Sequence, residues 1–217
     1  RGTGSAPGDG DPAQAQDAPT DATDIVSLGK AIFFDANLSA NGTQACATCH
    51  DPAAGFTGPD AAINSAGAVY EGALPDHFGN RKPPAAAYAG DSPELYFDET
   101  EGAWFGGMFW DGRATGASLG DPLAEQAQGP FLNPLEQAVA DAEELCAKVD
   151  KASYAGLFEQ VWGADSLDCA KDADGAYERI ARSIAAYERS AEVSPFSSKF
   201  DLFWDTAKAA GKDVTQI

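Results

Sequence analysis

The residues with the clearest chemistry lie in one short segment, Cys46-Ala47-Thr48-Cys49-His50. This C-x-x-C-H spacing is typical of covalent haem attachment, because each thiol can form a thioether with one vinyl group of a c-type haem. The following imidazole would be the proximal ligand of the iron. A disulfide or a zinc site is the alternative, but zinc needs about four ligands, and the other cysteines and histidine are distant in sequence. The motif predicts one covalent haem c, with His50 on its iron.

The charge of the chain limits its partners. Its 217 residues include 14 Lys and Arg against 34 Asp and Glu, a formal net charge of −20. Nucleic acid binding needs a basic surface, so no nucleic acid partner is expected. An acidic surface can attract a basic redox partner such as a small cytochrome, or it can serve solubility alone.

The two cysteines outside the motif form an even pair. We predict a disulfide between Cys146 and Cys169, with two buried free thiols as the alternative. A disulfide and a covalent haem both indicate an oxidising periplasmic or extracellular compartment. The sequence has no apolar run of about 20 residues, so no membrane span is predicted. No signal peptide is seen, as expected of a secreted protein after its removal.

Apolar residues at helical spacing predict a mainly α protein with long irregular loops. Tyr154, Leu157 and Phe158, for example, share one helical face, and Gly163 follows as a helix end. Asn133-Pro134-Leu135-Glu136 has the pattern of a helix start, with Asn as N-cap and Glu at the third position. Helices are expected at about residues 24–34, 121–128, 133–149, 153–162, 175–191 and 197–210. No alternating strand pattern stands out.

Two regions lack helical periodicity. Residues 1–23 are rich in Gly, Pro, Ala, Asp and Gln, a composition that predicts a flexible tail or tether. Residues 51–118 are rich in turn residues and, toward their end, in aromatic residues. A long loop of this kind indicates a ligand that supplies part of the core, and a haem would be such a ligand.

Longer motifs surround the haem signature. Leu28-Gly29-Lys30-Ala31-Ile32-Phe33-Phe34-Asp35 precedes it, and Gly55-Phe56-Thr57 follows it. Further on come Phe109-Trp110-Asp111-Gly112-Arg113-Ala114, Gln126-Ala127-Gln128-Gly129-Pro130, Asn133-Pro134-Leu135-Glu136, and a late helix ending in Tyr187-Glu188-Arg189. Over roughly residues 24–200 the chain resembles the first, N-terminal haem domain of the bacterial di-haem cytochrome c peroxidases.

The resemblance implies a cytochrome c-like fold and an oxidoreductase that reduces hydrogen peroxide with electrons from a donor protein. Members normally carry two haem domains, whereas this chain has one haem motif. We therefore expect a haem domain at residues 24–195. Residues 196–217 would hold a helix and the start of a connector to a second haem domain or subunit, absent from this chain. The alternative is a non-enzymatic electron-transfer cytochrome subunit of a larger assembly.

The resemblance also implies a catalytic pair. Gln126 and Glu136 lie ten residues apart, as the family's peroxide-handling glutamine and glutamate do. Peroxide reduction needs a group that moves a proton between the two peroxide oxygens, and a carboxylate suits this general acid and base work. The alternative for Glu136 is a structural one, as the third residue of a capping box that begins at Asn133.

Further roles carry alternatives of their own. His77 is expected as a sixth haem ligand, with a surface loop position as the alternative. Met108 is a further axial candidate, with core packing as the alternative. Trp110 would pass electrons between haems, or be a core aromatic. Arg81 and Arg113 would pair with haem propionates, because guanidinium matches carboxylate geometry, or form surface salt bridges.

One position departs from the family pattern. Many members hold a calcium ion between their domains with the help of an Asn, where this chain has Lys82. An ammonium group offers calcium no oxygen ligand. A calcium site is therefore doubtful here.

Overall fold

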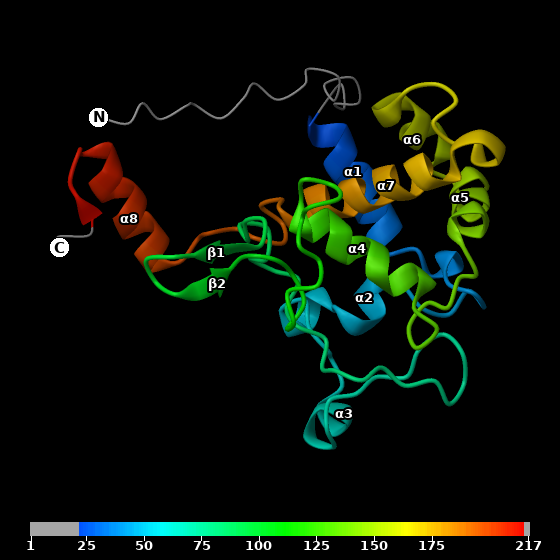
Figure 1. The fold of residues 1–217 in the computed structure, drawn as a ribbon, viewed down its shortest axis with the longest axis horizontal. Coiled ribbons are helices and arrows are strands. Elements are labelled where there is room, and N and C mark those ends of the chain that lie inside the picture. Colours follow the sequence, from blue (N-terminus) through cyan, green and yellow to red (C-terminus); the bar gives the residue numbers. More distant parts are fainter. Residues whose placement is uncertain (1–21, 215–217) are drawn as a thin grey trace, which may run out of the picture.

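The computed structural model describes residues 22–214 and is mainly helical, as predicted (Figure 1). Its helices are α1 (Ala22–Phe33), α2 (Cys46–Cys49), α3 (Ala61–Ser65), α4 (Pro122–Leu132), α5 (Ala142–Asp150), α6 (Ala155–Trp162), α7 (Cys169–Glu188) and α8 (Lys199–Ala209). Short 3-10 turns at Ala36–Leu38 and Pro52–Ala54 and a two-stranded sheet complete it. No helix within this described range is long and apolar enough to cross a membrane. The predicted tail falls almost wholly on residues 1–21, outside the described residues.

Helix α7 is the centre of the core, and α1, α4 and α5 all pack against it (Figure 1). Its inward face carries Ile180, Ala181 and Ile184, which are fully buried or nearly so. Phe33 at the end of α1 packs edge-on against Tyr187 of α7. The helical spacing of these apolar residues, which the sequence predicts, is therefore what joins the two helices.

Helices α1 and α7 approach each other closely at Gly29. A Cβ atom built on Gly29 would lie 1.8 Å from the carbonyl oxygen of Ser183 and 3.0 Å from Cβ of Tyr187. Since no side chain fits into that space, the crossing depends on a glycine at this position. This contact fixes the position of α1 relative to α7.

The predicted disulfide is present. Cys146 of α5 and Cys169 at the start of α7 are bonded, with their Cα atoms 5.6 Å apart. The bond joins two of the helices that build the core. The alternative of two free thiols is excluded for this pair.

The predicted helix at residues 133–149 is wrong. Asn133 ends α4 instead of starting a helix, and the chain turns before α5 begins at Ala142 behind the N-cap Asp141. Ala138 has a left-handed backbone with φ of 56°. The segment folds back onto α4, because Gln137 N–H donates to the carbonyl of Pro130 (3.1 Å) and Val139 N–H to that of Phe131 (2.9 Å). Helix α4 also runs four residues past the predicted end at Gln128.

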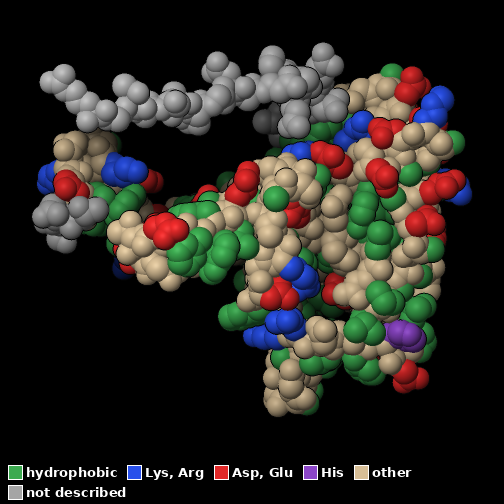
Figure 2. All heavy atoms as spheres, viewed as in Figure 1, with side chains coloured by type: hydrophobic (Ala, Val, Ile, Leu, Met, Phe, Trp, Pro, Cys, Tyr) green, Lys and Arg blue, Asp and Glu red, His purple; other side chains and the backbone are tan. Residues whose placement is uncertain are grey.

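A small hairpin interrupts the irregular region and was not predicted. Strands β1 (Tyr96–Asp98) and β2 (Ala103–Phe105) pair antiparallel. Its four aromatic side chains are all more than 40% exposed, and they are Tyr96, Phe97, Trp104 and Phe105. Figure 2 shows hydrophobic side chains gathered over the hairpin. Helix α8 stands apart from the helical body beyond it (Figure 1), with Phe200 and Leu202 exposed.

Candidate functional site

The haem motif forms the one-turn helix α2, and His50 follows as its C-terminal residue. The N–H of His50 donates to the carbonyl of Cys46 (2.9 Å). Nδ1 of His50 lies 3.1 Å from the carbonyl oxygen of Phe56, which can only accept, so Nδ1 carries the proton. Burial lowers the pKa of His50. A neutral imidazole held through Nδ1 presents Nε2 as a metal ligand, which is the arrangement a proximal haem ligand needs.

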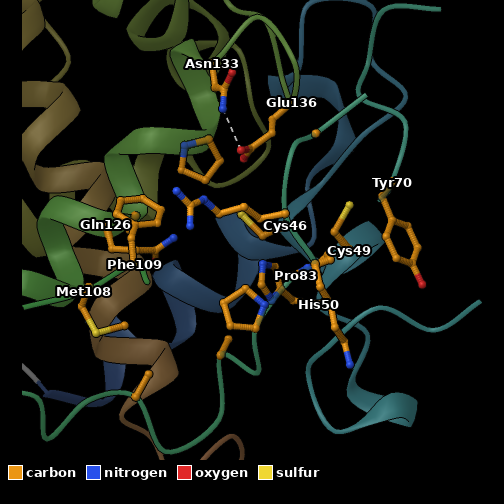
Figure 3. A pocket seen from close by; sticks show the side chains of 18 of the residues that line it. Cys46, Cys49, His50, Tyr70, Pro83, Met108, Phe109, Gln126, Asn133 and Glu136 are labelled. Atoms are coloured by element: carbon orange, nitrogen blue, oxygen red, sulfur yellow. Dashed lines mark hydrogen bonds between the residues drawn. The ribbon is translucent and has the colours of Figure 1, made fainter. Parts of the chain in front are cut away.

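Both cysteines and His50 open into one cavity of about 380 Å³ (Figure 3). The cavity is built from segments far apart in the sequence, namely α2, the 79–89 loop, the 108–113 turn, α4 with the turn after it, and the end of α7. Its apolar walls include Phe33, Ala86, Leu123 and Ile184. A concave cavity that combines apolar walls with polar groups is typical of a cofactor site.

Two buried glutamines flank the thiols. Gln44 Nε2 lies 3.8 Å from Sγ of Cys49, and Gln137 Nε2 lies 3.8 Å from Sγ of Cys46. Burial raises the pKa of Cys46 to about 12 and that of Cys49 to about 11. These thiols are therefore protonated in the chain without haem. Sequence reasoning did not single out either glutamine, because their contact with sulfur exists only after folding.

Gln126 and Glu136 both line the cavity, from α4 and from the turn after it (Figure 3). Glu136 does not close a capping box, since no helix starts at Asn133. Instead, Asn133 Nδ2 donates to Glu136 Oε1 at 2.7 Å. Burial raises the pKa of Glu136, and the Asn133 hydrogen bond and the charge of Arg113 partly offset this effect. The predicted pair is thus brought together in one pocket.

A second loop fixes the backbone of Glu136. The N–H of Ala73 donates to the carbonyl of Glu136 at 2.7 Å. A Cβ atom on the preceding Gly72 would lie 2.4 Å from the carbonyl oxygen of Leu135. This contact therefore requires glycine at position 72, and it holds the turn that carries the carboxylate.

Cationic side chains gather at the cavity mouth. Arg81, Lys82 and Arg113 line the cavity, and Figure 2 shows basic side chains grouped beside the hairpin. Arg113 Nη1 donates to Asp111 Oδ1 (2.8 Å), and Arg81 Nη2 lies 3.5 Å from Asp111 Oδ2. The salt bridges named as the alternative are therefore present, and the same guanidinium groups face the cavity. Trp110 beside them is 80% exposed, so the core-aromatic alternative is wrong.

The structure does not bring His77 to this cavity. The side chain is exposed, and its Nδ1 lies 2.9 Å from the carbonyl oxygen of Pro75. The predicted sixth ligand thus gains no support from its position. Met108 does line the cavity and also packs against the small buried cluster of Leu123 and Ala124, so both of its predicted roles stay open.

Glu188 is a pocket residue for which sequence reasoning predicted no role. It is 5% exposed at the end of α7 and lines the cavity. A signal was present in the sequence, because Glu188 follows Ile180 and Ile184 at intervals of four residues on an otherwise apolar helix face. A carboxyl in such a stripe is buried with the rest of it.

The residues present fit a covalent haem. Two thiols and an imidazole nitrogen share one wall, the cavity has apolar sides for a porphyrin, and cations at its mouth match two propionates. A mainly helical fold with a C-x-x-C-H segment in such a cavity defines a c-type haem domain.

Comparison with known proteins identifies the family. A family model for di-haem cytochrome c peroxidase matches residues 23–209, and the chain belongs to this family, whose members use haem c. The chain is 41% identical over 179 residues to the methylamine utilization protein MauG of Paracoccus denitrificans (strain Pd 1222), covering 82% of this chain and 43% of that protein. It is 32% identical to a cytochrome c551 peroxidase of Nitrosomonas europaea, covering 86% and 45%.

Solved structures agree with this assignment. The diheme peroxidase BthA of Burkholderia thailandensis E264 superposes with a TM-score of 0.71 at 33% identity, covering 90% of this chain and 45% of that one. The chain spans less than half the length of each of these relatives. The predicted mainly α, cytochrome c-like fold is confirmed.

Proposed function

We propose that this chain forms the peroxide-reacting haem domain of a di-haem oxidoreductase that reduces hydrogen peroxide to water. The observation that carries the proposal is the presence of Gln126 and Glu136 in the cavity that also holds Cys46, Cys49 and His50. The relatives named as cytochrome c peroxidases support the same reaction. The balance is one peroxide, two protons and two electrons giving two waters.

Haem c, bound through both thioethers with His50 on its iron, would supply the electron-transfer and peroxide-binding chemistry. Glu136 would take the proton from the near oxygen of peroxide and return it to the far oxygen, while Gln126 orients the substrate by hydrogen bonding. The raised pKa of Glu136 suits both the uptake and the release of this proton, because a general acid and base works best with a pKa near the ambient pH. Asn133 holds the carboxylate in place.

The cations at the mouth would hold the propionates. Arg81 and Arg113 line the cavity and share Asp111 as partner. Each guanidinium has further N–H donors that can bind a second carboxylate. Lys82 beside them would add a third positive charge. The same charge argues against a calcium ion at this position.

The exposed aromatic surface supports a second haem domain. Trp110 is 80% exposed beside the cavity, and Trp104 on the hairpin is 67% exposed. Apolar side chains grouped on a surface mark an interaction site. A second haem domain or subunit would cover them and receive electrons from a donor protein, with Trp110 between the two haems. Residues 196–214, with α8, would lead into the connector.

The disulfide supports the predicted location. Cys146 and Cys169 are bonded, and disulfides form and persist in oxidising compartments. We therefore infer a periplasmic or extracellular protein. Its acidic surface, with 34 Asp and Glu against 14 Lys and Arg, would attract a basic donor such as a small cytochrome.

The test is Glu136→Gln in the full-length, haem-loaded protein. The amide keeps an oxygen that can accept from Asn133, so the melting temperature and the visible spectrum should match the parent. It cannot take up the peroxide proton, so turnover should fall by about 10²–10⁴-fold. The matched control is Glu159→Gln, an exposed position on α6 outside the cavity, and it should keep full turnover. Unchanged turnover in Glu136→Gln would remove Glu136 from the mechanism.

Met108 supports the second candidate function, an electron-transfer cytochrome. Its thioether lines the cavity, and a Met and His pair is a common ligand set of cytochromes that only carry electrons. Three results together would favour this function. The ferric spectrum would be low-spin, it would not change on addition of cyanide, and it would change in Met108→Leu. A parent protein that binds cyanide would favour peroxide chemistry.

A further inference from the structure

Glu188 is a buried carboxyl that the proposed mechanism does not use. It is the last residue of α7, it is 5% exposed, and its side chain lines the haem cavity. Its Oε2 atom is buried without a hydrogen-bond partner. A buried carboxylate oxygen without a hydrogen-bond partner is costly, since burial disfavours the charged form.

The neighbouring charges do not neutralise Glu188. Arg189, next in sequence, turns away and forms two hydrogen bonds to the carboxylate of Asp121, at 2.7 and 2.8 Å. Its Nε donates to the carbonyl of Gly90 at 3.1 Å. The titratable groups that interact with Glu188 are Arg189 and Tyr187 on its own helix, Asp121 at the start of α4, and Cys46 on α2. None of them donates a hydrogen bond to its Oε2.

Burial is therefore the dominant influence on this carboxyl. Burial, opposed by the charge of Arg189 and reinforced by that of Asp121, raises the pKa of Glu188 to about 8. The charge of Glu188 in turn raises the pKa of Cys46. Glu188 thus interacts electrostatically with Cys46, one of the two residues that would bind the haem. With a pKa of about 8, its carboxyl can gain or lose a proton near neutral pH.

We propose that Glu188 binds a proton when the haem attached to Cys46 and Cys49 is reduced. One electron from the donor protein converts the iron from ferric to ferrous, and one proton from solvent converts the carboxylate of Glu188 to the acid. The net charge of the cavity then stays constant. Ferric haem carries a positive charge that stabilises a nearby carboxylate in a low dielectric, and reduction removes that charge. The inference rests on the proposed function only in requiring a haem in this cavity.

The test is the pH dependence of the reduction potential of this haem, measured by spectroelectrochemistry on the full-length, haem-loaded protein without peroxide. Between the pKa values of Glu188 with oxidised and with reduced haem, the potential should fall by about 59 mV per pH unit, the value for a tenfold change in a one-electron equilibrium. Glu188→Gln should abolish this slope. Glu192→Gln should retain it, because Glu192 is four residues away, exposed and paired with Lys30.

Two results would overturn the proposal. One is a slope that persists in Glu188→Gln. The other is a slope that disappears in Glu136→Gln instead, because Glu136 is the other cavity carboxyl with a raised pKa. Should Glu188→Gln fail to fold, the redox difference infrared spectrum of the parent decides, since reduction must increase the carboxylic acid C=O band. An absent band refutes the proposal. None of these measurements uses peroxidase turnover, so a failure of the proposed peroxidase function can be distinguished from a failure of this proposal.

Discussion

Removal of the disulfide should lower stability by an amount that follows from the loop it closes. Cys146 and Cys169 are 23 residues apart. In the chain-entropy model, closing a loop of this length in the unfolded chain costs about 11.4 cal/mol/K, or about 3.4 kcal/mol at 25 °C. The double variant Cys146→Ala and Cys169→Ala should lose about this much unfolding free energy. For a chain of this size the loss lowers the melting temperature by about 7–14 °C.

The measurement is urea unfolding of the haem-loaded protein, followed by far-UV circular dichroism. Cys146 is fully buried, so its replacement by alanine also removes packed sulfur. Reduction of the parent disulfide controls for this, because it opens the loop while both sulfurs stay in place and the thioethers survive. Both routes should cost several kcal/mol. A loss below about 1 kcal/mol by both routes would show that the unfolded chain is compact near this loop, and would refute the entropic reasoning.

Two further predictions concern the α1–α7 crossing and the loop before the cavity. Gly29→Ala should lower the free energy of unfolding, measured with urea, by about 1–3 kcal/mol or more, because its Cβ would overlap the Ser183 carbonyl. The control Gly156→Ala on α6, with open space around it, should be neutral or stabilising. Equal stability of Gly29→Ala and the parent would contradict the close crossing. His77→Ala should leave the ferric and ferrous spectra unchanged, because His77 lies outside the cavity. A change from low-spin to high-spin ferric iron would show that the loop does bring His77 to the haem.

Helical periodicity predicted most of the fold because burial in this protein follows one face of each helix. Helix α6 ends at Gly163 as expected, and α8 begins behind the N-cap Ser198. The disulfide followed from the even number of cysteines. The failure lies after Asn133, where the local signal is real, since Asn133 Oδ1 accepts from the N–H of Leu135. A turn toward α4 satisfies the same groups, and no local pattern distinguishes it from a helix start.

The candidate site was predictable where it is local in sequence. The thiols and His50 needed only their spacing, and Gln126 with Glu136 needed the family pattern. Other features of the cavity arise from packing between distant segments. Gln137 of the turn after α4 contacts Cys46, which is 91 residues away in sequence, and Glu188 at the end of α7 lines the same cavity. The hairpin was missed because each of its strands has only three residues.

The raised pKa values of the two haem-binding thiols affect how readily the haem can be attached. A thiolate is the reactive form of cysteine, and pKa values of about 12 for Cys46 and about 11 for Cys49 leave almost none of it at neutral pH. The folded chain without haem is therefore a poor substrate for thioether formation. In an extended chain both thiols have ordinary pKa values and are open to the attachment machinery. The raised pKa values of both thiols thus favour attachment of the cofactor before the chain folds.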